Sequence, residues 1–163
     1  MTDGWRELYD TEYPRLLRAL LAIGGDPAAA EDAAQEAFVK AHQTGLDNIE
    51  KLPGWLLVVG SREVFRRAKR ARRETDLWAS LPARDDGFDT SADRVDLLAA
   101  LGELPERQRA IVVARYYYGL SYDEIADHFD IKSGTVGATL HQAIERLRQI
   151  QLAGRLARER CDD

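Results

Sequence analysis

Apolar side chains recur at intervals of three and four positions along most of the chain, and this spacing is the feature that most limits its fold. The first stretch that shows it runs from Trp5 to Leu21, and similar stretches lie on both sides of a polar segment in the middle of the chain. Such spacing places apolar side chains on one face of an α-helix, whereas a half-buried strand needs strict alternation. No segment alternates convincingly. The spacing therefore predicts an all-α fold.

Three helices are predicted in the N-terminal half of the chain. The first ends at a pair of glycines, and Asp26 and Pro27 then open the second, because Asp is a favoured N-cap and Pro is tolerated in the first turn. The expected inward face of the second helix consists mainly of small residues: Ala30, Ala33, Ala34, Ala37, Phe38 and Ala41. Residues 44–52 are expected to form a loop. A third helix is expected to start near Pro53 and to continue into a basic stretch.

Charge is unevenly distributed along the chain. The sequence holds 23 basic and 28 acidic residues, a formal net charge of −5, which by itself disfavours a nucleic-acid-binding protein. Between residues 62 and 73, however, Glu63 is the only acid among the basic residues Arg62, Arg66, Arg67, Lys69, Arg70, Arg72 and Arg73. A charge run is most often a solvated helix face. Because the sign of this run is almost unmixed, we favour a polyanionic partner.

Residues 75–95 interrupt the helical spacing. They combine a proline and a glycine with serines, threonines and five aspartates, a composition typical of a flexible acidic linker. This linker separates a domain at residues 1–74 from a second at residues 96–150, and a C-terminal tail follows at residues 151–163. The tail keeps helical spacing, so it either extends the last helix or binds a regulator.

The second domain contains two helices joined by a tight turn. Ser121 and Glu124 form a capping-box pattern that starts the first of them. Asp130 stands in the turn, where aspartate tolerates a left-handed backbone better than most residues. Two helices in this arrangement match a helix-turn-helix. Alone, this match is a moderate signal, because most helical hairpins contact no DNA.

Several classes of function are disfavoured by what the sequence lacks. No apolar run is long enough to span a membrane, and the first 25 residues lack the pattern of a secretion signal. The single cysteine, Cys161, excludes a disulfide within the chain and a multi-cysteine metal site, so a reducing cytoplasm is the default location. His42, His128 and His141 fall on three different predicted helices, and no nucleophile motif is present. We expect no catalysis, metal or cofactor.

Several motifs resemble the sigma-70 family of bacterial RNA polymerase sigma factors. Three segments look like region 2 of that family: LYDTEYPRLLRAL, AEDAAQEAFVKAH and GWLLVVGSREVFRRAKRARR. Two more resemble region 4: LGELPERQRAIVVARYYYGLSYDEIADHF and SGTVGATLHQAIERLR. Only these two regions are present, which is the architecture of the extracytoplasmic-function (ECF, group 4) type. The resemblance implies two small helical domains and a promoter-specificity factor.

The resemblance also implies a surface for docking on the polymerase. In the family, the second helix docks on the coiled coil of the largest subunit of core RNA polymerase. The matching polar positions here are Asp32, Gln35, Glu36 and Lys40. From the spacing alone, a solvated face with a weak Glu36–Lys40 pair is the simpler interpretation.

In the family, the third helix and the loop before it melt and read the −10 promoter element. The implied −10 contacts here are Asp47, Asn48, Trp55, Arg62, Arg66, Arg67, Lys69, Arg70 and Arg73. The spacing of Trp55 fits a buried core anchor better than a ring that stacks on a base. Arg62 stands where asparagine is usual, a change that bears on base reading but not on backbone binding.

In the family, the second helix of region 4 enters the major groove of the −35 element, and the flap region of the polymerase is its protein partner. The implied −35 contacts are Lys132, Ser133, Thr135, Thr139, His141 and Gln142. Gly137, Ala138 and Thr139 stand where many relatives carry cations, so we expect weak or unusual −35 recognition. Packing of these small residues against the neighbouring helix is the alternative interpretation.

The implied partners are core RNA polymerase and promoter DNA. An anti-sigma factor is common in the family, although nothing in the sequence identifies one. Two other hypotheses stay open: a helix-turn-helix regulator that does not dock on polymerase, and a degenerate sigma-like protein that acts through protein–protein contacts. The polar face of the second helix argues against the first of these, and the basic stretch argues against the second.

Overall fold

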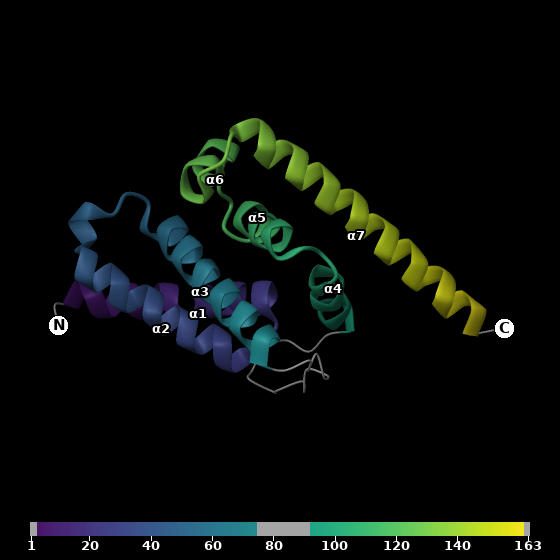
Figure 1. Ribbon diagram of the computed structural model, residues 1–163, viewed down its shortest axis with the longest axis horizontal. Helices are drawn as coiled ribbons and strands as arrows, with labels where there is room; N and C mark the ends of the chain where they lie inside the picture. The colour runs from purple at the N-terminus through teal and green to yellow at the C-terminus, as the bar shows by residue number, and fades with distance from the viewer. Residues whose placement is uncertain (1–2, 75–91, 162–163) are drawn as a thin grey trace.

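Every regular element that the structure describes is a helix. The computed structural model describes residues 3–74 and 92–161. Its elements are α1 (Asp3–Gly24), α2 (Pro27–Thr44), the short 3-10 helix η1 (Leu46–Asn48), α3 (Leu52–Glu74), α4 (Ala92–Gly102), α5 (Glu106–Tyr116), α6 (Tyr122–Phe129) and α7 (Ser133–Cys161) (Figure 1). The predicted all-α fold is confirmed. Most of the predicted linker lies outside the described residues, and its last four positions belong to α4.

The first three long helices pack around a core rich in small residues. Asp26 caps α2 as predicted, since its Oδ1 accepts a hydrogen bond from the Ala28 N–H at 3.1 Å. The six positions of the predicted inward face of α2 are all buried. Glycine allows a close approach between α1 and α3, because a Cβ on Gly60 would lie 2.8 Å from Leu20 Cδ1. This packing turns the polar face of α2 outward.

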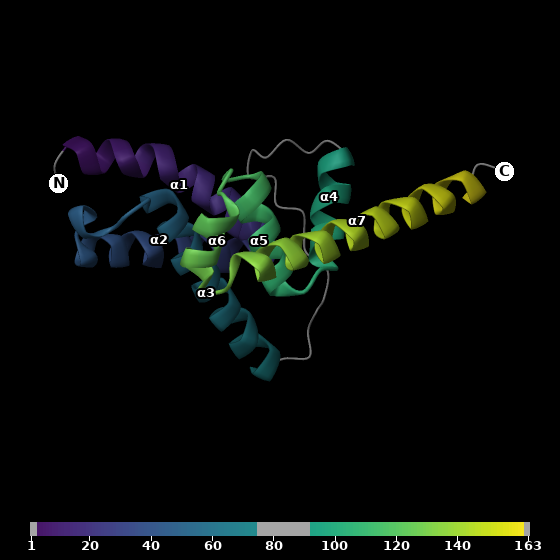
Figure 2. The same ribbon diagram turned by 90° about the horizontal axis from the view of Figure 1, so that it is seen from above.

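The helix-turn-helix forms where the sequence predicts it. The Glu124 N–H donates to Ser121 Oγ at 3.1 Å at the start of α6, which is one half of the predicted capping box. Asp130 ends α6 with φ 55° and ψ 51°, the left-handed conformation expected for this turn. Helix α7 then continues without interruption to Cys161, so residues 151–161 of the tail extend the last helix. Its C-terminal turns project beyond the other helices (Figure 2).

The two halves of the chain share one hydrophobic cluster, although the sequence predicts two separate bodies. Ala19, Ile23 and Leu57 of the N-terminal half belong to the same buried cluster as residues of α5, α6 and α7. Two further contacts join the halves: the Arg15 guanidinium lies 4.3 Å from the centre of the Tyr118 ring, and Lys51 Nζ lies 3.5 Å from Glu124 Oε1. The contact places the start of α3 beside α6.

Candidate functional site

The outward face of α2 carries the four residues implied in polymerase docking. Asp32 and Gln35 are exposed, and Glu36 and Lys40 are partly exposed, on the side of α2 opposite the buried alanines. Lys40 Nζ lies 3.6 Å from Glu36 Oε1, so the predicted pair is present. An exposed pair of this kind is weak and does not prevent either group from binding a partner.

One buried carboxylate organises the basic stretch on α3. The Glu63 side chain is only 5% exposed, and it accepts hydrogen bonds from Arg66 Nε at 3.2 Å, Arg66 Nη2 at 2.5 Å and Arg67 Nε at 3.0 Å. The hydrogen bond from Arg66 holds the pKa of Glu63 below its usual value, and the same bond raises the pKa of Arg66. Charge composition alone did not reveal this role, although the spacing of three and four residues was a usable signal.

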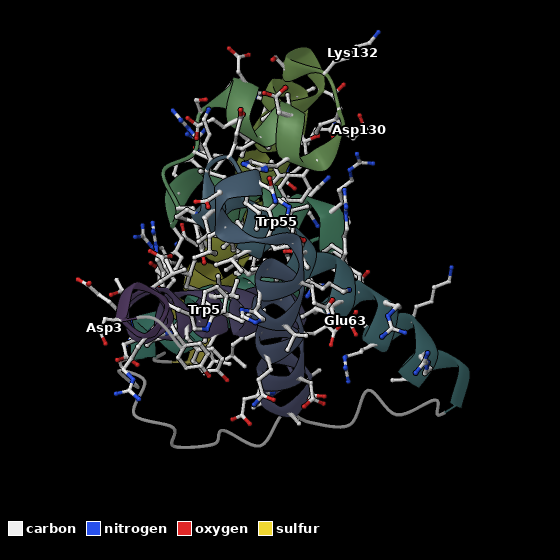
Figure 3. The ribbon with its side chains drawn as sticks, turned by 90° about the vertical axis from the view of Figure 1, so that its left-hand side faces the viewer. Asp3, Trp5, Trp55, Glu63, Asp130 and Lys132 are labelled. Carbon is white, nitrogen blue, oxygen red and sulfur yellow. The ribbon has the colours of Figure 1, made fainter. Side chains whose placement is uncertain are left out.

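Arg67 links the basic stretch to the docking face. Its Nη1 donates to Asp32 Oδ2 on α2 at 3.1 Å, while its Nε is held by Glu63 (labelled in Figure 3). The charge of Glu36 also acts on Arg66 and raises its pKa further. The structure therefore brings two candidate polymerase contacts of α2, Asp32 and Glu36, and two candidate DNA contacts of α3, Arg66 and Arg67, into one network of charges.

The other basic residues of α3 differ in how they are placed. Arg62, Lys69 and Arg70 are exposed, so a phosphate backbone has access to them. The backbone of Arg72 and Arg73 belongs to α3, but their side chains lie outside the described part of the structure. The exposed residues are the better candidates for contact with a polyanion.

The loop before α3 contains the short helix η1, which holds both candidate loop residues. Asp47 is exposed, whereas Asn48 Nδ2 donates to the Thr44 carbonyl oxygen at 2.8 Å and so satisfies a carbonyl at the end of α2. Trp55 is half-buried against the N-terminal core. This position supports its interpretation as a core anchor.

The six candidate −35 contacts lie on the turn before α7 and on its first turns. Lys132, Thr135, His141 and Gln142 are exposed, and Thr139 is half-buried. Ser133 Oγ donates to Asp123 Oδ1 at 2.6 Å, so its hydroxyl proton is already used. Figure 3 shows Lys132 at one end of the molecule, well away from Glu63 on α3.

The helix-turn-helix has an acidic surface. From residue 121 to residue 142 the only lysine or arginine is Lys132, whereas the carboxylates are Asp123, Glu124, Asp127 and Asp130. Contacts with phosphates supply most of the sequence-independent affinity for DNA. The charge of this segment therefore agrees with the expectation of weak −35 binding. Gly137 lies beside α6, since a Cβ there would be 3.5 Å from Tyr122 Cε2.

Two residues at the contact between the halves were not singled out as functional from the sequence. Arg109 is buried on α5. His128 lies against Gly54, where an added Cβ would come within 2.6 Å of Nε2, and burial lowers the pKa of His128. Among the described residues, no group of histidine, cysteine and acidic side chains could hold a metal ion, and no helix is long and apolar enough to cross a membrane.

Comparisons with known proteins identify both halves of the chain. Residues 8–74 match the family model for sigma-70 region 2, and residues 94–147 match the model for sigma-70 region 4. The ECF RNA polymerase sigma factor SigL of Mycobacterium tuberculosis is 33% identical over 153 residues, which cover 88% of this chain and 86% of SigL. The RNA polymerase sigma-E factor of Streptomyces coelicolor is 28% identical over 169 residues, which cover 96% of each chain.

Two solved structures share the fold. The sigma factor RpoE, solved in complex with the anti-sigma factor NepR from Bartonella quintana, gives a TM-score of 0.72 at 22% identity and covers 92% of this chain and 98% of its own. CnrH, solved in complex with the cytosolic domain of CnrY, gives a TM-score of 0.66 at 20% identity and covers 92% of this chain and 88% of its own.

The chain therefore belongs to the sigma-70 family, whose members are promoter-specificity factors of RNA polymerase. Within that family it is a sigma factor of the ECF type, and its two matched regions are region 2 and region 4.

Proposed function

We propose that the chain docks on core RNA polymerase through the exposed face of α2 and directs it to promoters with α3 and the helix-turn-helix. The observation that carries this proposal is the placement of Asp32, Gln35, Glu36 and Lys40 on an accessible helix face, opposite a buried alanine stripe. Because the buried face of α2 is packed against the core, the polar groups of its exposed face are held in fixed positions, which favours specific docking. The family resemblance names the coiled coil of the largest subunit as the surface that receives it.

The −10 element is the proposed target of α3 and of the loop before it. Arg62, Lys69 and Arg70 are exposed on α3 and would contact phosphates. Asp47 and Asn48 lie on η1, where the loop would receive an unstacked base. Trp55 would support that loop from the core side.

The helix-turn-helix is proposed to bind the −35 element weakly and to contact the flap region of the polymerase. Thr135, His141 and Gln142 are exposed on α7 and would face base edges. Lys132 is the only lysine or arginine between residues 121 and 142, so this segment itself would contribute little phosphate affinity. Recognition of a promoter would thus depend on the attachment of this domain to the polymerase.

The polymerase performs the chemistry in this proposal, so the chain is not an enzyme and acts in the cytoplasm with its partner. An anti-sigma factor is a further proposed partner. The support for it is the fold shared with RpoE and CnrH, which were solved in complexes with NepR and with the cytosolic domain of CnrY.

Run-off transcription with core polymerase and genomic DNA, followed by mapping of the start sites, tests this function. We expect the chain to confer initiation at a distinct set of start sites that share two sequence elements. Triple replacement of Arg62, Lys69 and Arg70 by glutamine should leave polymerase binding intact and reduce promoter opening. The absence of any chain-dependent start site would contradict the proposal.

A regulator that acts only through protein–protein contacts is the second candidate, because the helix-turn-helix is acidic. The same assay separates the two functions. Such a regulator would bind polymerase or another protein without conferring new start sites.

A further inference from the structure

Arg67 lies between two carboxylates that belong to different surfaces. Its Nε donates to Glu63 Oε1 at 3.0 Å, and its Nη1 donates to Asp32 Oδ2 at 3.1 Å. The Glu63 side chain is 5% exposed, whereas the Asp32 side chain is 59% exposed. The guanidinium is thus held by one fixed anion on its own helix and by one accessible anion on α2.

These two carboxylates offer Arg67 the same chemistry as a DNA backbone. Phosphate and carboxylate oxygens are both anionic acceptors that guanidinium groups bind through charge-assisted hydrogen bonds. A phosphate would therefore compete with Asp32 for the hydrogen bond from Arg67 Nη1 and for the electrostatic attraction of the guanidinium. Because Asp32 is exposed and the pair is solvated, the pair is weak enough for a competitor to separate it.

We propose that Asp32 is an internal competitor for Arg67, so that a cationic surface that binds Asp32 releases Arg67 for a nucleic-acid phosphate. This inference rests on the proposed function, which places Asp32 in the docking face of α2 and Arg67 in the basic stretch of α3. Coupling of this kind is reciprocal: a phosphate that takes Arg67 leaves Asp32 available to a cationic partner. The ion pair links polymerase docking to DNA binding without a change of fold.

The single substitution Asp32→Asn tests the inference on the full chain in the absence of polymerase. We expect it to strengthen binding of a fluorescent single-stranded DNA of mixed sequence by about twofold to fivefold at low salt, the range that corresponds to an exposed ion pair. Fluorescence anisotropy at several salt concentrations measures this change. The dependence of affinity on salt should also steepen, by up to about one phosphate contact.

Glu31→Gln is the matched control, because it changes the net charge by the same amount on the same helix. Burial raises the pKa of Tyr13 on α1, and the charge of Glu31 adds to that shift, whereas the carboxylates paired with Arg67 are those of Asp32 and Glu63. An equal gain in both variants would show a general charge effect and would overturn the inference. An unchanged affinity in Asp32→Asn would overturn it as well.

A double variant identifies the residue through which Asp32 acts. In an Arg67→Gln background, Asp32→Asn should give no gain beyond that of Glu31→Gln, because the competed donor is gone. A gain that persists there would contradict the role of Arg67.

Arg70→Gln separates failure of the inference from failure of the proposed function. Weaker DNA binding in this variant, together with equal effects of Asp32→Asn and Glu31→Gln, would overturn the inference alone. Unchanged DNA binding in Arg70→Gln would overturn the assignment of α3 to DNA, and this inference with it.

Discussion

The buried guanidinium of Arg109 on α5 donates a hydrogen bond from Nη1 to the main-chain carbonyl oxygen of Ile23 near the end of α1, with an N···O distance of 2.5 Å. Its Nε donates to the Leu104 carbonyl oxygen at 3.0 Å, and the whole residue is 6% exposed. The last carbonyl groups of a helix lack partners within the helix and carry partial negative charge. One side chain thus connects the region 4 half of the chain to the first helix of region 2.

Replacing Arg109 by glutamine should lower the free energy of unfolding by about 2–3 kcal/mol, because buried carbonyl groups lose a charged donor. Urea denaturation followed by circular dichroism measures this change. Arg107→Gln is the matched control, since Arg107 is exposed on the same helix and its replacement should change stability by less than about 0.5 kcal/mol. Equal stability of the two variants would contradict the structural role of Arg109.

A side chain at position 54 should loosen the contact between α3 and α6. In Gly54→Ala, the new Cβ would meet the His128 ring at Nε2, so the ring must move and the contact with α6 weakens. We expect a loss of about 1 kcal/mol in the free energy of unfolding relative to Gly134→Ala, where the added Cβ meets no atom within 4 Å. Thermal denaturation of both variants compares them. A Gly54→Ala protein as stable as its control would show that this contact is absent in solution.

His128 should make stability depend on pH. Burial lowers its pKa in the folded chain from the ordinary value of 6.5, although the nearby carboxylates of Glu124 and Asp127 oppose this shift, and Lys51 adds to it. The contribution of neutral His128 to the free energy of unfolding is therefore fully present above about pH 6.5. It is lost as the pH falls through the pKa of His128 in the folded chain, because the unfolded chain binds the proton more readily. Urea denaturation between pH 5 and pH 7.5 should show this loss in the native chain. His128→Gln should lose less stability over the same interval. If the free energy of unfolding of both proteins changed equally with pH, His128 would not be the source of the pH dependence.

Helix α7, which we propose to read the −35 element, should gain DNA affinity from one added cation. Ala138 is exposed on α7 among the candidate −35 contacts, so Ala138→Arg places a charge on the surface proposed to face the major groove. We expect tighter binding to the mapped −35 duplex and a salt dependence steeper by about one phosphate contact. Ala153→Arg, exposed farther along the same helix, provides the control. If the two arginines strengthened binding equally, the N-terminal turns of α7 would not be the DNA-facing part.

Local sequence signals predicted most of the helices correctly, because each signal acts within a few residues. The N-cap at Asp26, the left-handed turn at Asp130 and the buried alanines of α2 all follow from nearest neighbours along the chain. The continuation of α7 to Cys161 also follows from its helical spacing.

Contacts between distant segments were not predictable in the same way. The hydrogen bond from Arg109 to Ile23 joins residues 86 positions apart, and no periodicity in the sequence encodes such a pairing. The pair between Asp32 and Arg67 was equally hidden, since it depends on how α2 packs against α3. The candidate site residues could be named from motifs. The ion pair between Asp32 and Arg67, however, became visible only in the three-dimensional arrangement.

Equilibrium binding of core RNA polymerase to the fluorescently labelled full chain is the most direct test of the central claim that α2 is the docking face. Charge reversal at both Asp32 and Glu36, as Asp32→Lys with Glu36→Lys, should weaken binding by about 30-fold or more, while circular dichroism shows an intact fold. Glu7→Lys with Asp10→Lys, which reverses two exposed acids on α1, should bind like the native chain. Native affinity of the α2 variant, or equal losses in both variants, would contradict the assignment of α2.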